Sequence, residues 1–196
     1  MIKKGIILAG GMGTRMSPLT KAVNKQLLPL YDKPLIFYPL SVLMLAGIRK
    51  ILIIVNKGQL NQFRKVLPEK NNLGISIEYK EQPNPGGLPE AFTIGEKFIS
   101  NDNVSLILGD NFFYGQSLTK ILKKNMNLKT GAKIFIHPVK RPQLFGVATL
   151  NKSKKVISLK EKPKNSKSNL AVTGLYFFDK KVVELTKKLK QSKRGE

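Results

Sequence analysis

The chain has 196 residues, of which 35 are Lys or Arg and 12 are Asp or Glu, so its formal net charge is +23. With 41% hydrophobic residues it can form a sizeable core, which excludes wholesale disorder and collagen-like repeats. The chain has no cysteine and one histidine, which excludes disulfides, thiol catalysis, a zinc centre and a Ser-His-Asp triad.

Continuous apolar runs alternate with helix-compatible segments in the first part of the chain. The pattern predicts strands at 5–9, 50–55, 75–79 and 104–108, and helices at 34–46, 59–67 and 88–98. This alternation indicates an α/β fold with a Rossmann-like, mainly parallel sheet flanked by helices. Ligands of such sheets bind at the carboxyl ends of the strands.

From residue 118 onward the pattern changes to one dominated by strands. It predicts helices at 118–126 and 181–190, and strands at 133–137, 146–150, 156–159 and 171–178. No apolar run reaches the about 18 residues of a membrane span, and the first residues lack a signal-peptide pattern. We therefore expect a soluble cytoplasmic protein without a membrane partner.

The positive charge is unevenly distributed, with a net +6 over residues 1–119 and +17 over residues 120–196. The lysines of the second part are dispersed, and aromatic residues do not alternate with them as they do in single-strand binding surfaces. We interpret them as a solvated face that attracts phosphorylated ligands, and we expect no specific nucleic-acid partner.

A glycine-rich loop follows the first predicted strand and comprises Gly10, Gly11 and Gly13, then Thr14 and Arg15. It matches neither the P-loop, which needs a Gly-Lys-Ser/Thr sequence, nor the dinucleotide fingerprint, which needs a third glycine or alanine at Met16. Such a loop offers backbone N–H groups to phosphate oxygens, and the guanidinium can bridge two of them. The alternative is a tight turn with a surface arginine.

Asp110 lies directly after the fourth predicted strand, at the same expected edge of the sheet. If the glycine loop binds phosphate, a carboxylate that faces the same phosphate would require a cation between them, so we expect Asp110 to bind a metal. An aspartate that caps the next turn is the structural alternative.

Several further motifs occur in a fixed order along the chain. They are Leu8-Ala9-Gly10-Gly11-x-Gly13-Thr14-Arg15, Lys25-Gln26-Leu27-Leu28-Pro29, Tyr31-Asp32-Lys33-Pro34, Leu108-Gly109-Asp110-Asn111, Glu161-Lys162-Pro163, Val172-Thr173-Gly174-Leu175-Tyr176 and Arg194-Gly195-Glu196. Together they resemble the sugar-phosphate nucleotidylyltransferases, most closely those that act on dTTP and glucose 1-phosphate. The resemblance implies the nucleotide-diphospho-sugar transferase fold and Mg²⁺ as the cofactor.

The resemblance also implies roles for individual residues. Arg15, Lys25 and Lys162 would be catalytic, and Asp110 would bind the metal. The nucleotide-binding residues would be Leu8, Gly10, Gly11, Gly13, Thr14, Arg15, Gln26, Gln82 and Gly87. The sugar-phosphate-binding residues would be Asn111, Gly146, Glu161, Lys162, Val172, Tyr176 and Arg194.

The same resemblance predicts one catalytic domain, 1–196, with a nucleotide-binding half at 1–119 and a sugar-phosphate-binding part at 120–196. Members of this family continue beyond Arg-Gly-Glu, so we expect a chain truncated at its C-terminus that would form a homo-oligomer at full length. Three alternatives stay open. They are a weakly active or non-catalytic module that binds nucleotide or sugar phosphate, a uridylyltransferase of the same fold, and an RNA-associated protein that depends on the +23 charge.

Overall fold

The computed structural model describes residues 1–11, 13–83 and 86–189. The contacts between residues define two compact units, the first made of Met1–Lys133 and the residues from Phe177 onward, the second of Ile134–Tyr176. The chain passes between the units through β7 (Ala132–Pro138) and β10 (Leu170–Phe178). In the part of the chain that is described, no helix is both long and apolar enough to cross a membrane.

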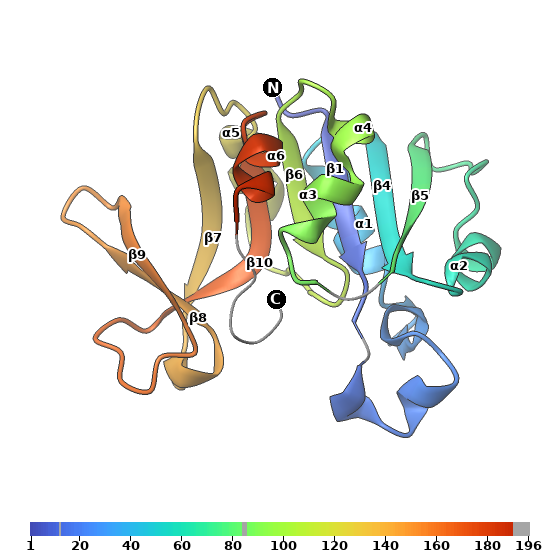
Figure 1. Ribbon diagram of the computed structural model, residues 1–196, viewed down its shortest axis with the longest axis horizontal. Coiled ribbons are helices and arrows are strands. Elements are labelled where there is room, and N and C mark those ends of the chain that lie inside the picture. The colour runs from blue at the N-terminus through green and yellow to red at the C-terminus, as the bar shows by residue number, and fades with distance from the viewer. Residues whose placement is uncertain (12, 84–85, 190–196) are drawn as a thin grey trace. The chain divides into compact units, whose positions relative to one another are not determined.

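The first unit is built on four parallel strands in the order β5-β4-β1-β6 (Figure 1). They are β1 (Lys4–Ala9), β4 (Lys50–Asn56), β5 (Ser76–Gln82) and β6 (Val104–Leu108). The two central strands are apolar on both faces, and their isoleucines are fully buried. This confirms the mainly parallel sheet that the apolar runs predict, since only strands covered on both faces show such runs.

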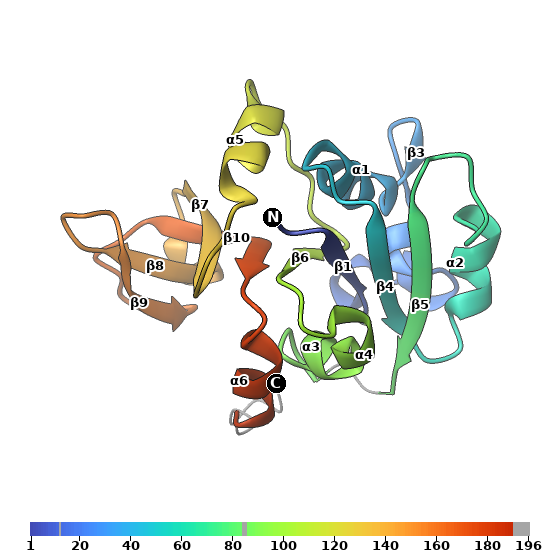
Figure 2. The ribbon, with the colours of Figure 1, turned by 90° about the horizontal axis from the view of Figure 1, so that it is seen from above.

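Helices cover both faces of this sheet. The set comprises α1 (Phe37–Leu45), α2 (Leu60–Val66), α3 (Glu90–Ile94), α4 (Glu96–Ile99), α5 (Leu118–Asn125) and α6 (Val182–Lys187). Figure 2 shows α1 on one side of the strands, and α3 and α4 on the other. The sheet is therefore the middle layer of three, as expected for a chain of βαβ units.

The connection from β1 to α1 is longer than a simple loop and carries local structure that the sequence patterns did not predict. It contains three 3₁₀ turns, η1 (Thr14–Met16), η2 (Leu19–Lys21) and η3 (Lys25–Leu27). A short antiparallel hairpin of β2 (Pro29–Leu30) and β3 (Lys33–Pro34) follows. Because Pro34 belongs to this hairpin, α1 begins at Phe37 and not at residue 34.

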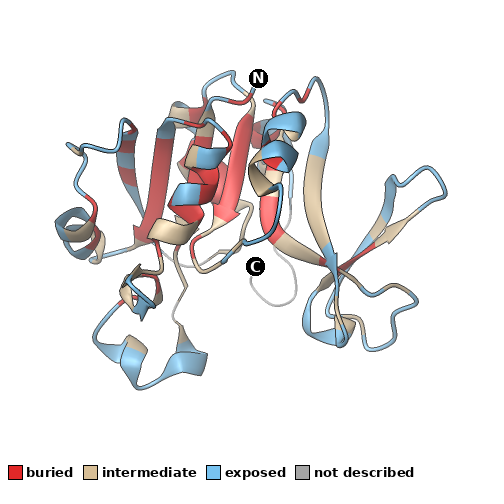
Figure 3. Cartoon of the chain, turned by 180° about the vertical axis from the view of Figure 1, so that it is seen from behind, coloured by how far each residue is buried: buried red, intermediate tan, exposed pale blue. Residues whose placement is uncertain are grey.

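The second unit is an antiparallel arrangement of strands. β8 (Gly146–Leu150) pairs with β9 (Val156–Glu161) and with β10, and β7 also pairs with β10. The 3₁₀ turn η4 (Pro142–Leu144) precedes β8. Most of β9 is exposed, whereas β1 and β4 are almost wholly buried (Figure 3). The difference matches the sequence, since β9 contains the polar residues Ser158, Lys160 and Glu161, whereas β1 and β4 are nearly continuous apolar runs.

Several further element boundaries differ from the prediction, among them the C-terminal ends of α6 and β9, and two of the differences have a clear structural context. The helix expected at 88–98 is two short helices that meet at Gly95, where an added Cβ would lie 2.9 Å from the carbonyl oxygen of Ala91 and 3.1 Å from Ile6. The close approach to the sheet explains the break. The strand expected at 75–79 continues to Gln82, because β5 stays paired with β4 up to Asn56 and Gln82.

The parallel strands all end at one edge of the first unit. Ala9, Asn56, Gln82 and Leu108 are the last residues of β1, β4, β5 and β6. The glycine loop and Asp110 follow two of these ends directly. The fold therefore places at this edge the glycine loop and Asp110, which the sequence nominated for binding the triphosphate and the metal.

Candidate functional site

The glycine-rich loop leaves β1 beside Leu8, which is half-buried. Gly13 adopts a left-handed conformation with φ 60° and ψ 26°, and it begins the 3₁₀ turn that holds Thr14 and Arg15. The hydroxyl of Thr20 donates to the carbonyl oxygen of Gly13 at 2.8 Å. A side chain at Gly13 would be strained by its φ and would meet Thr20, so glycine is required here. Thr14 and Arg15 are exposed.

Lys25 and Asp110 form an ion pair, although 85 positions separate them in the sequence. The Nζ of Lys25 lies 2.5 Å from Oδ2 of Asp110, and the two side chains are 29% and 32% exposed. Lys25 begins η3, which is capped by Asn24, whose Oδ1 accepts from the N–H of Gln26 at 2.8 Å. The fold thus brings together a predicted catalytic residue and the predicted metal ligand.

Asp110 fits a magnesium ligand by its chemistry. Among the described residues, no group of three or more His, Cys, Asp or Glu gathers in one place. Mg²⁺ is usually held by one or two carboxylates together with phosphate oxygens of the substrate. A single, partly exposed carboxylate at the edge where the glycine loop begins is compatible with that arrangement.

Gln26 and Gln82 are buried at the same edge, with 3% and 4% of their surface exposed. Gln26 donates from Nε2 to the carbonyl oxygen of Gly10 at 3.4 Å, while its Oε1 has no hydrogen-bond partner among the described residues. Buried acceptors without a partner are rare, because the lost hydration is not replaced. The unpartnered Oε1 therefore indicates a place for a ligand's donor.

Two asparagines hold this edge together, and the sequence reasoning missed both. Asn24 is 3% exposed and donates from Nδ2 to the carbonyl oxygen of Ala9 at 3.3 Å and to Oε1 of Gln59 at 2.5 Å. Asn56 contacts both Gly11 and Gln82. The sequence did offer one signal for Asn56, because it is a polar residue at the end of an otherwise apolar strand. In the structure this strand lies beside β1, which precedes the glycine loop.

The other nominated residues of the first unit lie on turns. Asn111 follows Asp110, and its N–H donates to the carbonyl oxygen of Leu108 at 3.2 Å. Gly87 has a φ of +85°, which a side chain would disfavour.

In the second unit, Gly146, Glu161 and Lys162 lie together where β8 begins and β9 ends. Gly146 pairs with Glu161 across the two strands, and the N–H of Lys162 donates to the carbonyl oxygen of Phe145 at 3.0 Å. The Nζ of Lys162 lies 3.6 Å from Oε1 of Glu161. Lys162 has a φ of 40°, uncommon for a residue with a side chain, and such strain concentrates at functional sites.

Val172 and Tyr176 both lie on β10, and both are partly buried. Burial raises the pKa of the Tyr176 hydroxyl, and the nearby negative charge of Glu161 raises it further. The charge of Glu161 therefore acts on the hydroxyl of Tyr176. Arg194, the remaining nominated residue, lies outside the described residues.

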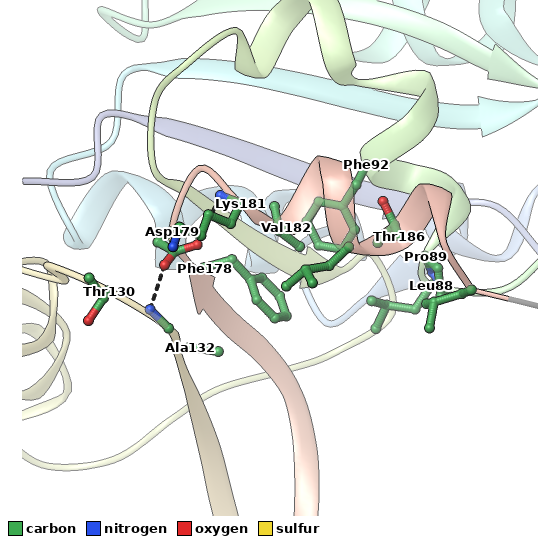
Figure 4. Close-up of a pocket in the computed structure, with 13 residues that line it drawn as sticks. Leu88, Pro89, Phe92, Thr130, Ala132, Phe178, Asp179, Lys181, Val182 and Thr186 are labelled. Carbon is green, nitrogen blue, oxygen red and sulfur yellow. Dashed lines mark hydrogen bonds between the residues drawn. The ribbon is translucent and has the colours of Figure 1, made fainter.

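A cavity of about 550 Å³ lies elsewhere in the first unit, between α3, α6 and the residues that precede β7 (Figure 4). Its lining is mostly apolar and includes Phe92, Phe178 and Val182. Asp179 at its side accepts the N–H of Gly131 at 2.6 Å. None of the nominated site residues lines this cavity. The cavity is therefore not the phosphate-binding site that the sequence predicts.

The parallel sheet, the glycine loop and the Lys25–Asp110 pair at one edge are the features of a phosphoryl-transfer protein that binds nucleotides. The family described as Nucleotidyl transferase matches residues 4–196, and the chain belongs to that family.

Within this family, the chain is similar to glucose-1-phosphate thymidylyltransferases. It is 56% identical to the one from Neisseria meningitidis serogroup A over 98% of this chain and 67% of that relative. It is 50% identical to the one from Xanthomonas campestris over 99% of this chain and 66% of the relative. This confirms the resemblance seen in the motifs. The chain spans about two thirds of the length of these relatives.

Solved structures agree on the fold. A Bacillus anthracis protein described as a glucose-1-phosphate thymidylyltransferase, in complex with a sucrose, superimposes with a TM-score of 0.89 and 40% identity. The match covers 98% of this chain and 77% of that chain. A UDP-glucose pyrophosphorylase complexed with UDP-glucose gives a TM-score of 0.84 and 26% identity over 100% and 83% of the two chains. The fold expected from the motifs is therefore confirmed.

Proposed function

We propose that the protein transfers the thymidylyl group of dTTP to α-D-glucose 1-phosphate and forms dTDP-glucose and pyrophosphate. The observation that carries this proposal is the convergence of the glycine loop, the Lys25–Asp110 pair and two buried glutamines at one edge of the sheet. The similarity to glucose-1-phosphate thymidylyltransferases supports the choice of substrates.

The proposed reaction is a single in-line displacement. A phosphate oxygen of glucose 1-phosphate attacks the α-phosphorus of dTTP, and the bond from that phosphorus to the bridging oxygen of the β-phosphate breaks. Pyrophosphate leaves with that oxygen and the electron pair, so no covalent intermediate forms on the protein. Such a step depends on positioning and positive charge more than on a general base.

The first unit would supply the positive charge. Arg15, exposed beside the loop, can bridge oxygens of two phosphates, and Lys25 lies close enough to Asp110 to serve the same phosphates. Bound Mg²⁺, held by Asp110 and phosphate oxygens, would neutralise charge on the triphosphate. The N–H of Gly11 donates to Asn56, so Gly11 would contribute to nucleotide binding through the shape of the loop.

The nucleoside would lie against the buried amides. Gln82 can both donate and accept toward the imide edge of thymine, and the unpartnered Oε1 of Gln26 can accept a donor of the nucleotide. Gly10 and Gly87 lack side chains that would keep a base or sugar at a distance, and Leu8 would add apolar contact.

The sugar phosphate would be held by the residues nominated for it in both parts of the chain. Lys162 would bind the phosphate, and Glu161 would accept hydrogen bonds from sugar hydroxyls. Asn111, Gly146, Val172 and Tyr176 would complete the pocket, with Arg194 on the phosphate.

Release of pyrophosphate from dTTP, glucose 1-phosphate and Mg²⁺ tests the proposal, with reactions lacking each substrate as controls. Release that requires both substrates supports it. Equal rates with UTP would favour a uridylyltransferase, an alternative that the likeness to UDP-glucose pyrophosphorylase makes worth testing. Binding of dTTP without release would favour a non-catalytic binding module, and binding of RNA that dTTP does not displace would favour an RNA-associated protein.

The state of assembly and the location of the protein are further proposals. An exposed aromatic cluster supports a homo-oligomer, because Phe112 and Tyr114 are 54% and 91% exposed and stack with centroids 6.4 Å apart. Light scattering of the purified protein tests it. The cytoplasmic location and the absence of a specific nucleic-acid partner remain predictions.

A further inference from the structure

The side-chain amide of Asn56 has only one orientation that its surroundings permit. Its Oδ1 accepts from the N–H of Gly11 at 3.1 Å, and its Nδ2 donates to the carbonyl oxygen of the same residue at 3.1 Å. A backbone N–H can only donate and a backbone carbonyl can only accept. A flipped Asn56 amide would therefore face donor with donor and acceptor with acceptor.

The same Oδ1 accepts a second hydrogen bond, from Nε2 of Gln82 at 3.2 Å. Asn56 and Gln82 are opposite residues at the ends of β4 and β5, so the contact follows from the strand register. A flipped Gln82 amide would place two acceptor oxygens against each other. The orientation of Gln82 is thus set by Asn56, whose own orientation is set by the backbone of the glycine loop.

The Gln82 amide also lies against Gly10, where an added Cβ would overlap it. Gln82 is 4% exposed, so it has little space in which to adopt another rotamer. Its position and its orientation are therefore both constrained, the first by the loop and the second by Asn56.

A fixed amide orientation distinguishes pyrimidine bases by their hydrogen-bonding edges. One N–H of the Gln82 side chain donates to Asn56, so its carbonyl oxygen and its second N–H remain available to bind a base. Thymine and uracil offer an N3–H donor beside a carbonyl acceptor, whereas cytosine offers an N3 acceptor beside an amino donor. A glutamine that is free to flip can pair with either edge, but a fixed one can suit only one of them.

We propose that Asn56 is a positioning residue that fixes the Gln82 amide and thereby gives the site its preference for thymine and uracil nucleotides over cytosine nucleotides. The inference rests on the proposed function, because it assumes that Gln82 faces the base. Asn56 itself contacts protein groups and acts through Gln82.

Calorimetric binding of dTTP and dCTP to the whole chain tests the proposal through the ratio of the two dissociation constants. In Asn56→Ala the preference for dTTP should fall about tenfold, because the freed Gln82 can rotate to accommodate cytosine. Asn56→Leu, whose side chain is of similar size to that of asparagine, should reduce the preference for dTTP by the same factor. It replaces Asn56→Ala as the test if the alanine variant does not fold.

Asn56→Asp is the conservative variant that separates positioning from general damage. Its carboxylate still accepts from Gly11 and Gln82, although it loses the hydrogen bond to the carbonyl oxygen of Gly11. Because the acceptor for Gln82 is kept, the preference for dTTP should stay within about twofold of the unchanged protein. The added negative charge should weaken both triphosphates alike. Asn71→Ala, which removes an asparagine bonded only to nearby backbone carbonyls and the N–H of Leu73, is the matched control and should change neither constant.

The two proposals fail in different ways. If the unchanged protein binds dTTP but the preference is the same in Asn56→Ala and Asn56→Leu, the role of Asn56 is overturned and the proposed function stands. If the unchanged protein does not bind dTTP, the proposed function is overturned and the role of Asn56 with it.

Discussion

The two units hold their nominated residues in opposite ways. At the sheet edge of the first unit, Gln26, Gln82 and Asn24 are buried and held by hydrogen bonds, which they donate to the carbonyl oxygen of Gly10, to Oδ1 of Asn56 and to the carbonyl oxygen of Ala9 respectively. In the second unit, Glu161 and Lys162 are 61% and 41% exposed and lie 3.6 Å apart. If the nominated roles hold, the base would be recognised by a rigid scaffold, whereas the sugar phosphate would be held by solvated charges at a hairpin end.

Arg15 is the exception within the first unit, because it is exposed like the charges of the second. If it stabilises charge in the transition state, Arg15→Ala should lower the rate of pyrophosphate release by about 10²–10³-fold, the usual cost of removing one preorganised charge contact. Arg64→Ala is the control, since Arg64 pairs with Glu69 on the surface and has no proposed role. A loss below about threefold would show that Arg15 is only a surface residue of the turn.

The rigidity of the base-binding edge is tested by Gly10→Ala. The added Cβ would overlap the amide of Gln82, and overpacking of this kind costs about 1–3 kcal/mol. We expect dTTP affinity to fall about tenfold or more in a binding titration. The double variant Gly10→Ala/Gln82→Ala removes the overlap, so it should bind no worse than Gln82→Ala alone. A double variant that binds much worse would mean that the loop, and not Gln82, is damaged.

Sequence patterns predicted the parallel sheet and the edge at which its residues gather, because strands that are apolar on both faces and glycine-rich turns are local signals. The place of Gln82 at the end of β5 was not predictable in this way. The strand was expected to end at residue 79, and residues 80–82 are polar. They remain in the strand because they pair with the last residues of β4.

Asn56 and Gly95 show why the remaining features were missed. The contacts of Asn56 depend on β4 lying between β1 and β5, and the order of strands is a property of the whole sheet. The helix break at Gly95 depends on its distance from Ile6 and Leu52 in the sheet below. In both cases the cause is a neighbour distant in sequence, which periodicity within one segment cannot reveal.

For the second unit, the contrast between the two units predicts that a substitution weakens the binding of glucose 1-phosphate but not that of dTTP. Lys162→Met should raise the KM for glucose 1-phosphate about tenfold, since a hydrogen bond to a charged group contributes about 1.5–3 kcal/mol and exposure reduces that value. The affinity for dTTP should not change. Lys164→Met, a nearby exposed lysine without a proposed role, is the control. An equal loss of dTTP affinity would mean that Lys162 serves the triphosphate, and the division of labour between the units would be wrong.

The smallest expected effect concerns the stability of the first unit and its dependence on pH. Tyr79 is 8% exposed and donates from its hydroxyl to the carbonyl oxygen of Leu67, and burial raises its pKa above the ordinary 10.0. The hydroxyl's contribution is therefore fully present below about pH 10 and is lost as the pH rises above that value.

Tyr79→Phe should lower the free energy of unfolding by about 1–3 kcal/mol at neutral pH, because the carbonyl of Leu67 loses its partner. The difference between the two proteins should shrink above about pH 10, where folding of the unchanged protein must keep the hydroxyl protonated while the unfolded chain ionises. Urea titrations from about pH 8 to about pH 11 measure it. Tyr31→Phe, at a tyrosine 98% exposed, should show no such convergence. A difference that stays constant over this range would mean that Tyr79 ionises as easily in the folded protein as in the unfolded chain, and that this part of the scaffold is open to water.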